Sequence, residues 1–164
     1  MILQNARAAG IMPSLNHYRK RFLNEPEFAV RAITPFIVHD VNIWDAGVQR
    51  KTIIRFWKMR KDIRIDKVSR FIGYWENGCP VSSDSEKIYC SVYEWKKDAP
   101  WRYAVAVGNF TRQEKEIELK IDWNALGIKK PQSVRELWTG KDVPVSELGK
   151  VKLKGGHFAL FGIK

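Results

Sequence analysis

Residues 71–93 have the sequence FIGYWENGCPVSSDSEKIYCSVY, and the spacing of apolar residues differs on the two sides of this stretch. Before it, apolar residues recur at helical spacing among many arginines, and after it they alternate with polar residues. Side chains repeat every 3.6 residues on one face of a helix and every second residue on one face of a strand. We therefore interpret this stretch as the junction between two units, residues 1–68 and residues 69–164.

The composition is that of an ordinary globular protein, with 45% apolar and 29% charged residues among 164. This length suffices for one domain with its own core, or for a small domain plus part of another. No apolar run is long enough for a secretory signal or a membrane span. We therefore expect no membrane contact, while the localisation of any longer parent protein stays open.

The net charge of +11 is concentrated in the first part of the chain. Residues 1–70 hold 14 Lys and Arg against 6 Asp and Glu, whereas residues 71–164 hold 15 against 12. Such a field attracts nucleic acid, an anionic polysaccharide or an acidic membrane surface. The interpretation that we favour is a basic helical face that is solvated or meets an acidic partner surface.

The N-terminal part predicts a helix, a short strand and a second helix. Asn24 is a candidate cap, Pro26 suits a first turn, and Pro35 should end or kink the first helix. Residues 37–45 are short and rich in β-branched side chains, which favours a buried strand or a strand-like connector. The second helix is expected over residues 48–59. One strand between two helices has no partner in this part, so we expect it to be the end of something larger.

The C-terminal part predicts a succession of short strands separated by turn signals such as Asn-Gly and Gly-Gly. In residues 116–122, EIELKID, apolar and charged residues alternate strictly, as in a strand with one buried and one wet face. Residues 122–127, DWNALG, predict a helical turn capped by Asp122 and stopped by Gly127. This pattern favours an antiparallel β-sandwich. The expected strands are 71–75, 88–95, 102–110, 115–122, 133–138, 150–154 and 158–163.

The order of these segments is familiar. VAVGNFTRQEKEIELKIDWNALGI (105–128), SVRELWTGKDVP (133–144) and VKLKGGHFALFGIK (151–164) resemble the C-terminal β-sandwich that follows the (β/α)8 barrel in many glycoside hydrolases, the α-galactosidase type among them. FIVHDVNIWD (36–45), the helix after it and FIGYWENG (71–78) resemble the last strand, last helix and exit of the barrel in a further group of glycoside-hydrolase-like proteins.

This resemblance implies an α+β fold, with an N-terminal helical remnant of a (β/α)8 barrel followed by an antiparallel β-sandwich. It also implies an accessory, structural role for the sandwich in a parent protein that acts on or binds carbohydrate. Hydrolytic carboxylates of such barrels come from several strand ends, and most of those strands are absent here. We therefore expect the parent to be a glycoside hydrolase and this chain alone to be catalytically inactive.

Four residues are candidates for substrate binding: His39, Asp40, Trp44 and Asp45. If residues 37–45 form the final barrel strand, its C-terminal end faces the substrate, where Trp44 could stack on a sugar ring and Asp45 could hydrogen-bond a hydroxyl. The structural alternative is a capping Asp45, a core Trp44 and a polar turn. No carboxylate pair is placed for hydrolysis, so no catalytic residue is assigned.

Neither a metal nor a cofactor is expected. The histidines are far apart in sequence, and no phosphate-binding glycine loop or metal-ligand spacing is present. His157 is interpreted as a structural residue at a turn. Cys79 and Cys90 flank a predicted hairpin and could bridge its base in an oxidising compartment; we favour reduced thiols.

Two other functions stay open. A carbohydrate-binding or anionic-polymer-binding sandwich could use Tyr89, Tyr93 and Trp95, which lie on the opposite strand face from residues such as Cys90. The basic helical region could bind nucleic acid with Trp57 stacking on a base. We do not expect nucleic acid to be the partner, because Phe56 and Trp57 fall on the predicted core stripe.

Overall fold

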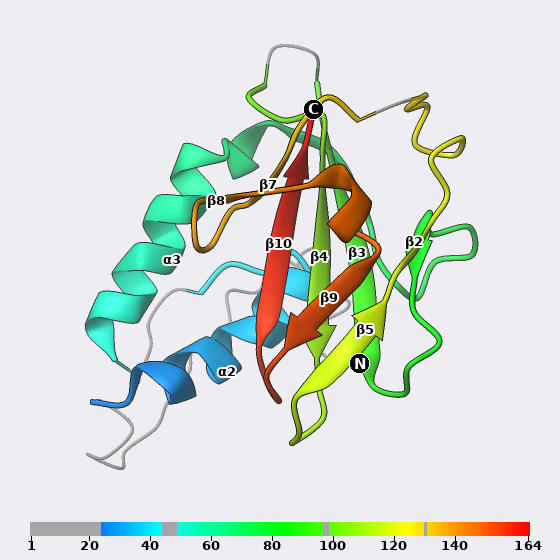
Figure 1. Ribbon diagram of the computed structural model, residues 1–164. Coiled ribbons are helices and arrows are strands. Elements are labelled where there is room, and N and C mark those ends of the chain that lie inside the picture. Colours follow the sequence, from blue (N-terminus) through cyan, green and yellow to red (C-terminus); the bar gives the residue numbers. More distant parts are fainter. Residues whose placement is uncertain (1–23, 44–48, 97–98, 130) are drawn as a thin grey trace.

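The computed structural model describes residues 24–43, 49–96, 99–129 and 131–164, which form an α+β fold in layers (Figure 1). The two helices lie on one face of a large antiparallel sheet, and short strand pairs cover its other face. The elements are α2 (Pro26–Val38), α3 (Arg50–Asp62), η2 (Ile65–Lys67), β1 (Val68–Ile72), β2 (Val81–Ser82), β3 (Ile88–Trp95), β4 (Tyr103–Asn109), β5 (Lys115–Glu118), β6 (Lys120–Ile121), β7 (Val134–Glu136), β8 (Lys141–Val143), η3 (Val145–Glu147), β9 (Lys150–Leu153) and β10 (Phe158–Ile163).

The large sheet has the strand order β1-β3-β4-β10-β7-β8, and every neighbouring pair is antiparallel. The second layer consists of the antiparallel pairs β2–β6 and β5–β9. The predicted α+β fold class with an antiparallel β-sandwich is thus confirmed. The helices form a third layer behind the sandwich.

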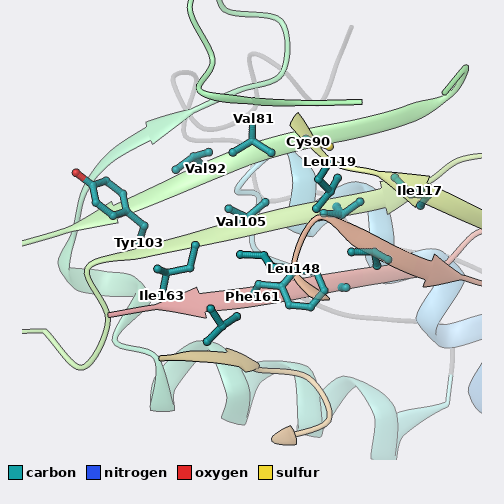
Figure 2. Packing of buried hydrophobic residues seen from close by; sticks show 14 of the residues in the cluster. Val81, Cys90, Val92, Tyr103, Val105, Ile117, Leu119, Leu148, Phe161 and Ile163 are labelled. Carbon is teal, nitrogen blue, oxygen red and sulfur yellow. The ribbon is translucent and has the colours of Figure 1, made fainter. Parts of the chain in front are cut away.

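The central sheet separates two hydrophobic cores. On the helix side, Tyr93 and Trp95 pack with side chains of α2 and α3. On the other side, Cys90 and Val92 pack with Ile117 and other residues of the short strands, as Figure 2 shows. Successive residues of a strand point to opposite faces, so β3 contributes to both cores.

Strand β4 is buried along its whole length because both faces of the sheet are covered. Its sequence accordingly contains an apolar run, YAVAV, instead of an alternation. Gly108 allows α2 to approach closely, since a Cβ there would lie 3.0 Å from Cγ1 of Val38. The close contact between α2 and the sheet therefore depends on a glycine in the central strand β4.

The predicted strand over residues 37–45 is wrong for the residues that the structure describes. Helix α2 continues to Val38, and Asp40 adopts a left-handed conformation with a φ of +50°. The Val41 amide then donates to the carbonyl of Phe36 at 2.9 Å, which is the bond that closes a Schellman motif. A β-branched run thus lies in the last turn of a helix, because that turn is buried.

Two details of α2 differ from the expectations. Pro35 lies inside the helix, so of the two predicted effects it does not end the helix, and Glu25 instead of Asn24 occupies the cap position. An interior proline costs about 3 kcal/mol. Burying an apolar side chain contributes about 1.5–3 kcal/mol. The buried residues Ile33, Phe36, Ile37 and Val38 therefore outweigh the proline.

Helix α3 begins at Arg50 and extends beyond the predicted end to Asp62. Phe56 is fully buried, as expected, but Trp57 is 40% exposed. Adjacent residues on a helix point about 100° apart, so the two rings cannot share the centre of one face. Trp57 lies on the outer face with Ile54, and its indole Nε1 donates to the carbonyl of Ile43 at 3.1 Å.

The predicted strands differ from the observed ones mainly at their ends. The predicted strand 115–122 divides at Leu119 into β5, which pairs with β9, and β6, which pairs with β2. The first predicted strand, 71–75, starts earlier as β1 and ends at Ile72. Strands β2 and β8 were not predicted, since runs of two or three residues carry no periodic signal.

The turn over residues 122–127 forms as predicted. The Asp122 carboxylate accepts from the Ala125 amide at 2.9 Å, and Gly127 has a φ of +61°.

Cys79 and Cys90 are free thiols in the structure, and burial raises the pKa of Cys90 to about 12. None of the helices in the described ranges has the length and apolarity that a membrane span requires.

Candidate functional site

His39 lies at the end of α2, where it is buried between the helix and the segment that follows β1. Its Nδ1 lies 2.7 Å from the carbonyl of Pro35 and its Nε2 lies 3.3 Å from the hydroxyl of Tyr74. A carbonyl only accepts, so Nδ1 carries the proton and Nε2 accepts from Tyr74. Burial lowers the pKa of His39, which keeps the ring neutral.

Aromatic side chains surround this histidine. The ring of Trp75 stacks on His39 with a centroid separation of 5.4 Å, and Tyr74 stacks on Tyr89 at 4.3 Å. Trp75 is 37% exposed, so the cluster reaches the surface. The absence of a side chain at Gly73 lets the indole fold over the backbone, because a Cβ there would lie 2.4 Å from the Trp75 ring.

Sequence reasoning placed Tyr74 and Trp75 in a strand and missed their contact with His39. The observable signal is the glycine before two aromatic residues in G-Y-W-E-N-G, which is typical of a turn with a packed aromatic side chain. Glu76 completes this turn by accepting from the Gly73 amide at 2.7 Å.

Asp40 forms a buried ion pair with Arg60 of α3, with 3.3 Å between Oδ1 and Nη2. The pair links the end of one helix to the last turn of the other. Nη1 of Arg60 is buried and has no hydrogen-bond partner within the described ranges. Removing one partner of a buried pair is strongly destabilising, so this contact fixes how α2 and α3 lie against each other.

The central sheet also holds the last turn of α2 through side-chain hydrogen bonds. Ser91 Oγ donates to the carbonyl of Val38 at 2.8 Å, and the Tyr93 hydroxyl donates to the carbonyl of Ile37 at 2.5 Å. These carbonyls belong to the last turn of the helix, where the usual i+4 helical donors are lacking, although the Asp40 amide also donates to the Ile37 carbonyl at 3.5 Å. Strand β3 therefore fixes the backbone immediately before Val41.

A comparison with known protein families identifies the module. The model of the glycoside hydrolase 123 C-terminal domain matches residues 52–141, more than half of the chain. The chain belongs to this family. The earlier resemblance to the C-terminal part of a glycoside-hydrolase-like protein is thereby confirmed.

Solved structures with a similar fold are glycoside hydrolases. A GH27 β-L-arabinopyranosidase from Geobacillus stearothermophilus is 14% identical with a TM-score of 0.52, and the alignment covers 85% of this chain and 30% of that one. A proposed α-N-acetylgalactosaminidase from Bacillus halodurans C-125 is 11% identical with a TM-score of 0.60, covering 85% and 32%.

A third similar structure is a proposed α-galactosidase/melibiase from Bacteroides fragilis NCTC 9343, at 12% identity, a TM-score of 0.57, and coverage of 85% and 29%. At these identities the similarity establishes the fold alone. The chain thus spans about a third of the length of each similar structure. No curated protein matches its sequence.

The four predicted substrate-binding residues precede the segment that matches the glycoside hydrolase 123 C-terminal domain, and the structure describes two of them. His39 and Asp40 are brought together at the end of α2, where they have the contacts described above. Trp44 and Asp45 lie outside the described residues. Their assignment to substrate binding stays a prediction.

The aromatic face of β3 is not an exposed binding platform. Tyr93 is 1% exposed and Trp95 4% exposed, because both rings lie beneath the helices. Trp95 Nε1 is satisfied by the carbonyl of Arg64 at 2.9 Å. Tyr89 alone of the three is half-buried. The hypothesis that Tyr93 and Trp95 form an exposed stacking platform is therefore wrong.

His157, interpreted from sequence as a structural turn residue, lies between the turn before β10 and the first turn of α2. Its Nε2 lies 2.7 Å from Oε2 of Glu27, and Lys154 Nζ donates to Oε1 of the same carboxylate at 3.2 Å. Burial lowers the pKa of His157, although the Glu27 carboxylate opposes this shift. Within the described ranges, no group of three His, Cys, Asp or Glu side chains is arranged to hold a metal ion.

Proposed function

We propose that this chain is the C-terminal accessory region of a longer glycoside-hydrolase-like protein. In this proposal residues 1–68 supply the last elements of a (β/α)8 barrel, and residues 69–164 form the sandwich that holds them in place. The sandwich has a structural role, and the chain by itself does not catalyse hydrolysis.

The observation that carries this proposal is the attachment of β3 to the end of α2. Ser91 and Tyr93 donate to the carbonyls of Val38 and Ile37, and both hydrogen bonds are buried. Holding this turn fixes where the segment from Val41 begins, and Trp44 and Asp45 follow it in the sequence. A sandwich that fixes the entry to a substrate-binding segment affects activity without touching the substrate.

The parent protein would bind carbohydrate through the predicted residues. Trp44 would stack on a sugar ring and Asp45 would accept from a hydroxyl, with His39 and Asp40 at the start of the same segment. The net charge of +11 additionally favours an anionic polysaccharide as the partner of the full-length protein.

A hydrolysis assay tests this proposal. The 164-residue chain, incubated with a panel of aryl glycosides, is expected to give no turnover above a blank. When the chain is extended with its upstream reading frame, turnover should appear, and Asp45→Ala should reduce it. Turnover by the 164 residues alone, lost in Asp45→Ala, would overturn the proposal.

A second comparison isolates the structural role. In the extended protein, Tyr93→Phe should lower kcat/KM, because it removes a hydrogen bond that orients the segment. Tyr89→Phe is the matched control, since it keeps the ring that stacks on Tyr74 and removes a hydroxyl other than the one that donates to α2. Equal activity of the two variants would exclude an effect of β3 on the active site.

A further inference from the structure

A cleft of about 1290 Å³ is lined by residues at one end of the strands β3, β4 and β10, Lys164 among them. In Figure 1 this end of the three strands lies near the label C. The lining of the cleft includes four cationic side chains: Lys96, Arg102, Lys129 and Lys164. Among the described residues of the lining, Glu94 supplies the one carboxylate side chain, and Lys164 of the 164-residue chain also carries an α-carboxylate. These residues come from distant parts of the sequence and are assembled only by the fold.

The four cations have no carboxylate partners within the described ranges. Arg102 instead lies over the ring of Tyr103 at 5.5 Å, and Lys164 Nζ lies 5.1 Å from the centroid of Trp101. Outside the cleft, several basic side chains form ion pairs with carboxylates, for example Lys152 with Glu114. Among its described residues, the cleft therefore carries more positive than negative charge, which favours an anionic ligand.

The remaining lining suits a saccharide. Trp101 is held in place because Gly162 lacks a side chain, so that the indole lies against β10; a Cβ on Gly162 would be 2.6 Å from the ring. Ser69 and Gln132 add neutral hydrogen-bonding groups. An aromatic ring, polar neutral groups and charges that match carboxylate or sulfate together form the kind of surface that acidic sugars require.

We propose that this cleft binds an anionic oligosaccharide. Carboxylate or sulfate groups pair with the four cations, and a sugar ring lies beside Trp101. The need for an anion follows from the cleft itself, whereas the choice of a saccharide over a nucleic acid rests on the proposed function.

Calorimetric titration of the 164-residue chain tests this site. The probes are a sulfated chondroitin hexasaccharide, its unsulfated counterpart, which keeps only the carboxylates, and an oligothymidylate of equal charge. The native chain is expected to bind at least one hexasaccharide. Binding of both attributes recognition to the carboxylates, and binding of the sulfated form alone attributes it to the sulfates.

Matched charge reversals locate the binding. Lys129→Glu with Lys164→Glu should weaken binding by about tenfold or more, because two charge-assisted contacts become repulsive. Lys58→Glu with Lys61→Glu on the exposed face of α3 changes the net charge equally and should weaken it less than about twofold, since distant exposed charges are screened. Circular dichroism spectra establish that all variants are folded.

Three results would overturn this inference. They are an absence of hexasaccharide binding by the native chain, equal weakening by both double variants, and cleft-dependent binding of the oligothymidylate alone. None of them bears on the accessory role, which is tested separately by hydrolysis with the extended protein.

Discussion

The hydroxyl of Tyr93, in the middle of β3, donates a 2.5 Å hydrogen bond to the carbonyl of Ile37 in the last turn of α2. Both groups are buried, and the residues are 56 positions apart in the sequence. The bond joins the sheet to the helical part of the chain at the point where the helix ends.

Removing this hydroxyl should destabilise the whole domain. Tyr93→Phe leaves the ring in the core but removes one of the donors to the Ile37 carbonyl, which keeps the Asp40 amide at 3.5 Å, so the expected cost is about 0.5–1.5 kcal/mol. Chemical denaturation followed by tryptophan fluorescence measures the loss. Tyr89→Phe removes a hydroxyl that does not make this hydrogen bond, so it should change stability by less than about 0.5 kcal/mol. Equal stability of the two variants would contradict a structural role for this hydrogen bond.

Asp40 combines two roles that substitutions can separate. Its left-handed backbone closes α2, and its carboxylate pairs with buried Arg60. Asp40→Ala should cost about 3 kcal/mol or more, because it removes the partner of a buried charge and places alanine at a positive φ.

Asp40→Asn should cost less, since asparagine tolerates the left-handed region and keeps an oxygen that can accept from Arg60. Asp40→Gly should lie between the two, because it relieves only the backbone cost. Thermal denaturation of the three variants checks this order, and an alanine variant as stable as the asparagine variant would show that neither role matters.

Acidification should destabilise the fold through its buried histidines. Burial lowers the pKa of His39, and burial likewise lowers that of His157. The unfolded chain therefore takes up protons near the ordinary pKa of 6.5, before the folded chain does. The stability from each histidine is complete above that value and is lost as the pH falls through it toward the lower folded pKa.

The melting temperature should accordingly drop between about pH 7.5 and about pH 5.5. His39→Gln should reduce the slope, because glutamine does not titrate while its amide can still donate to the Pro35 carbonyl. A melting temperature that rises on acidification, or a slope unchanged in both His39→Gln and His157→Gln, would refute this account.

The turn between β9 and β10 should tolerate no side chain at its first glycine. A Cβ on Gly155 would lie 2.3 Å from the carbonyl carbon of Arg112, which is backbone and cannot rotate away. Gly155→Ala should therefore destabilise the fold by about 1–3 kcal/mol. Gly149→Ala, where no atom lies within 4 Å of the added Cβ, should be neutral or slightly stabilising in the same melting experiment.

The accuracy of the sequence-based expectations follows the length and regularity of each segment. Strand β3 was predicted with its observed bounds, and the alternation in residues 116–122 correctly placed Ile117 and Leu119 inside and Glu116 and Glu118 outside. These signals are local, because strand periodicity depends only on which face is covered.

The expectations that failed needed information from distant residues. The β-branched run that ends α2 was assigned to a strand, since periodicity cannot distinguish a buried helical turn from a short buried strand. The assignment of Trp57 to the core was wrong, because the position of the sheet decides which face of α3 is covered. For the candidate site, His39 and Asp40 were found from sequence, but their partners Tyr74, Trp75 and Arg60 were not.

The sequence by itself determined the succession of helices and short strands, the antiparallel sandwich and the relationship to glycoside hydrolases, because each depends on the order and period of neighbouring residues. The tertiary structure alone decided that Tyr93 and Trp95 face the helices, that Asp40 meets Arg60, and that four cations from separate segments surround one cleft. Such contacts join residues that are distant along the chain, and only the closing of the sheet and the packing of the helices on it bring them together.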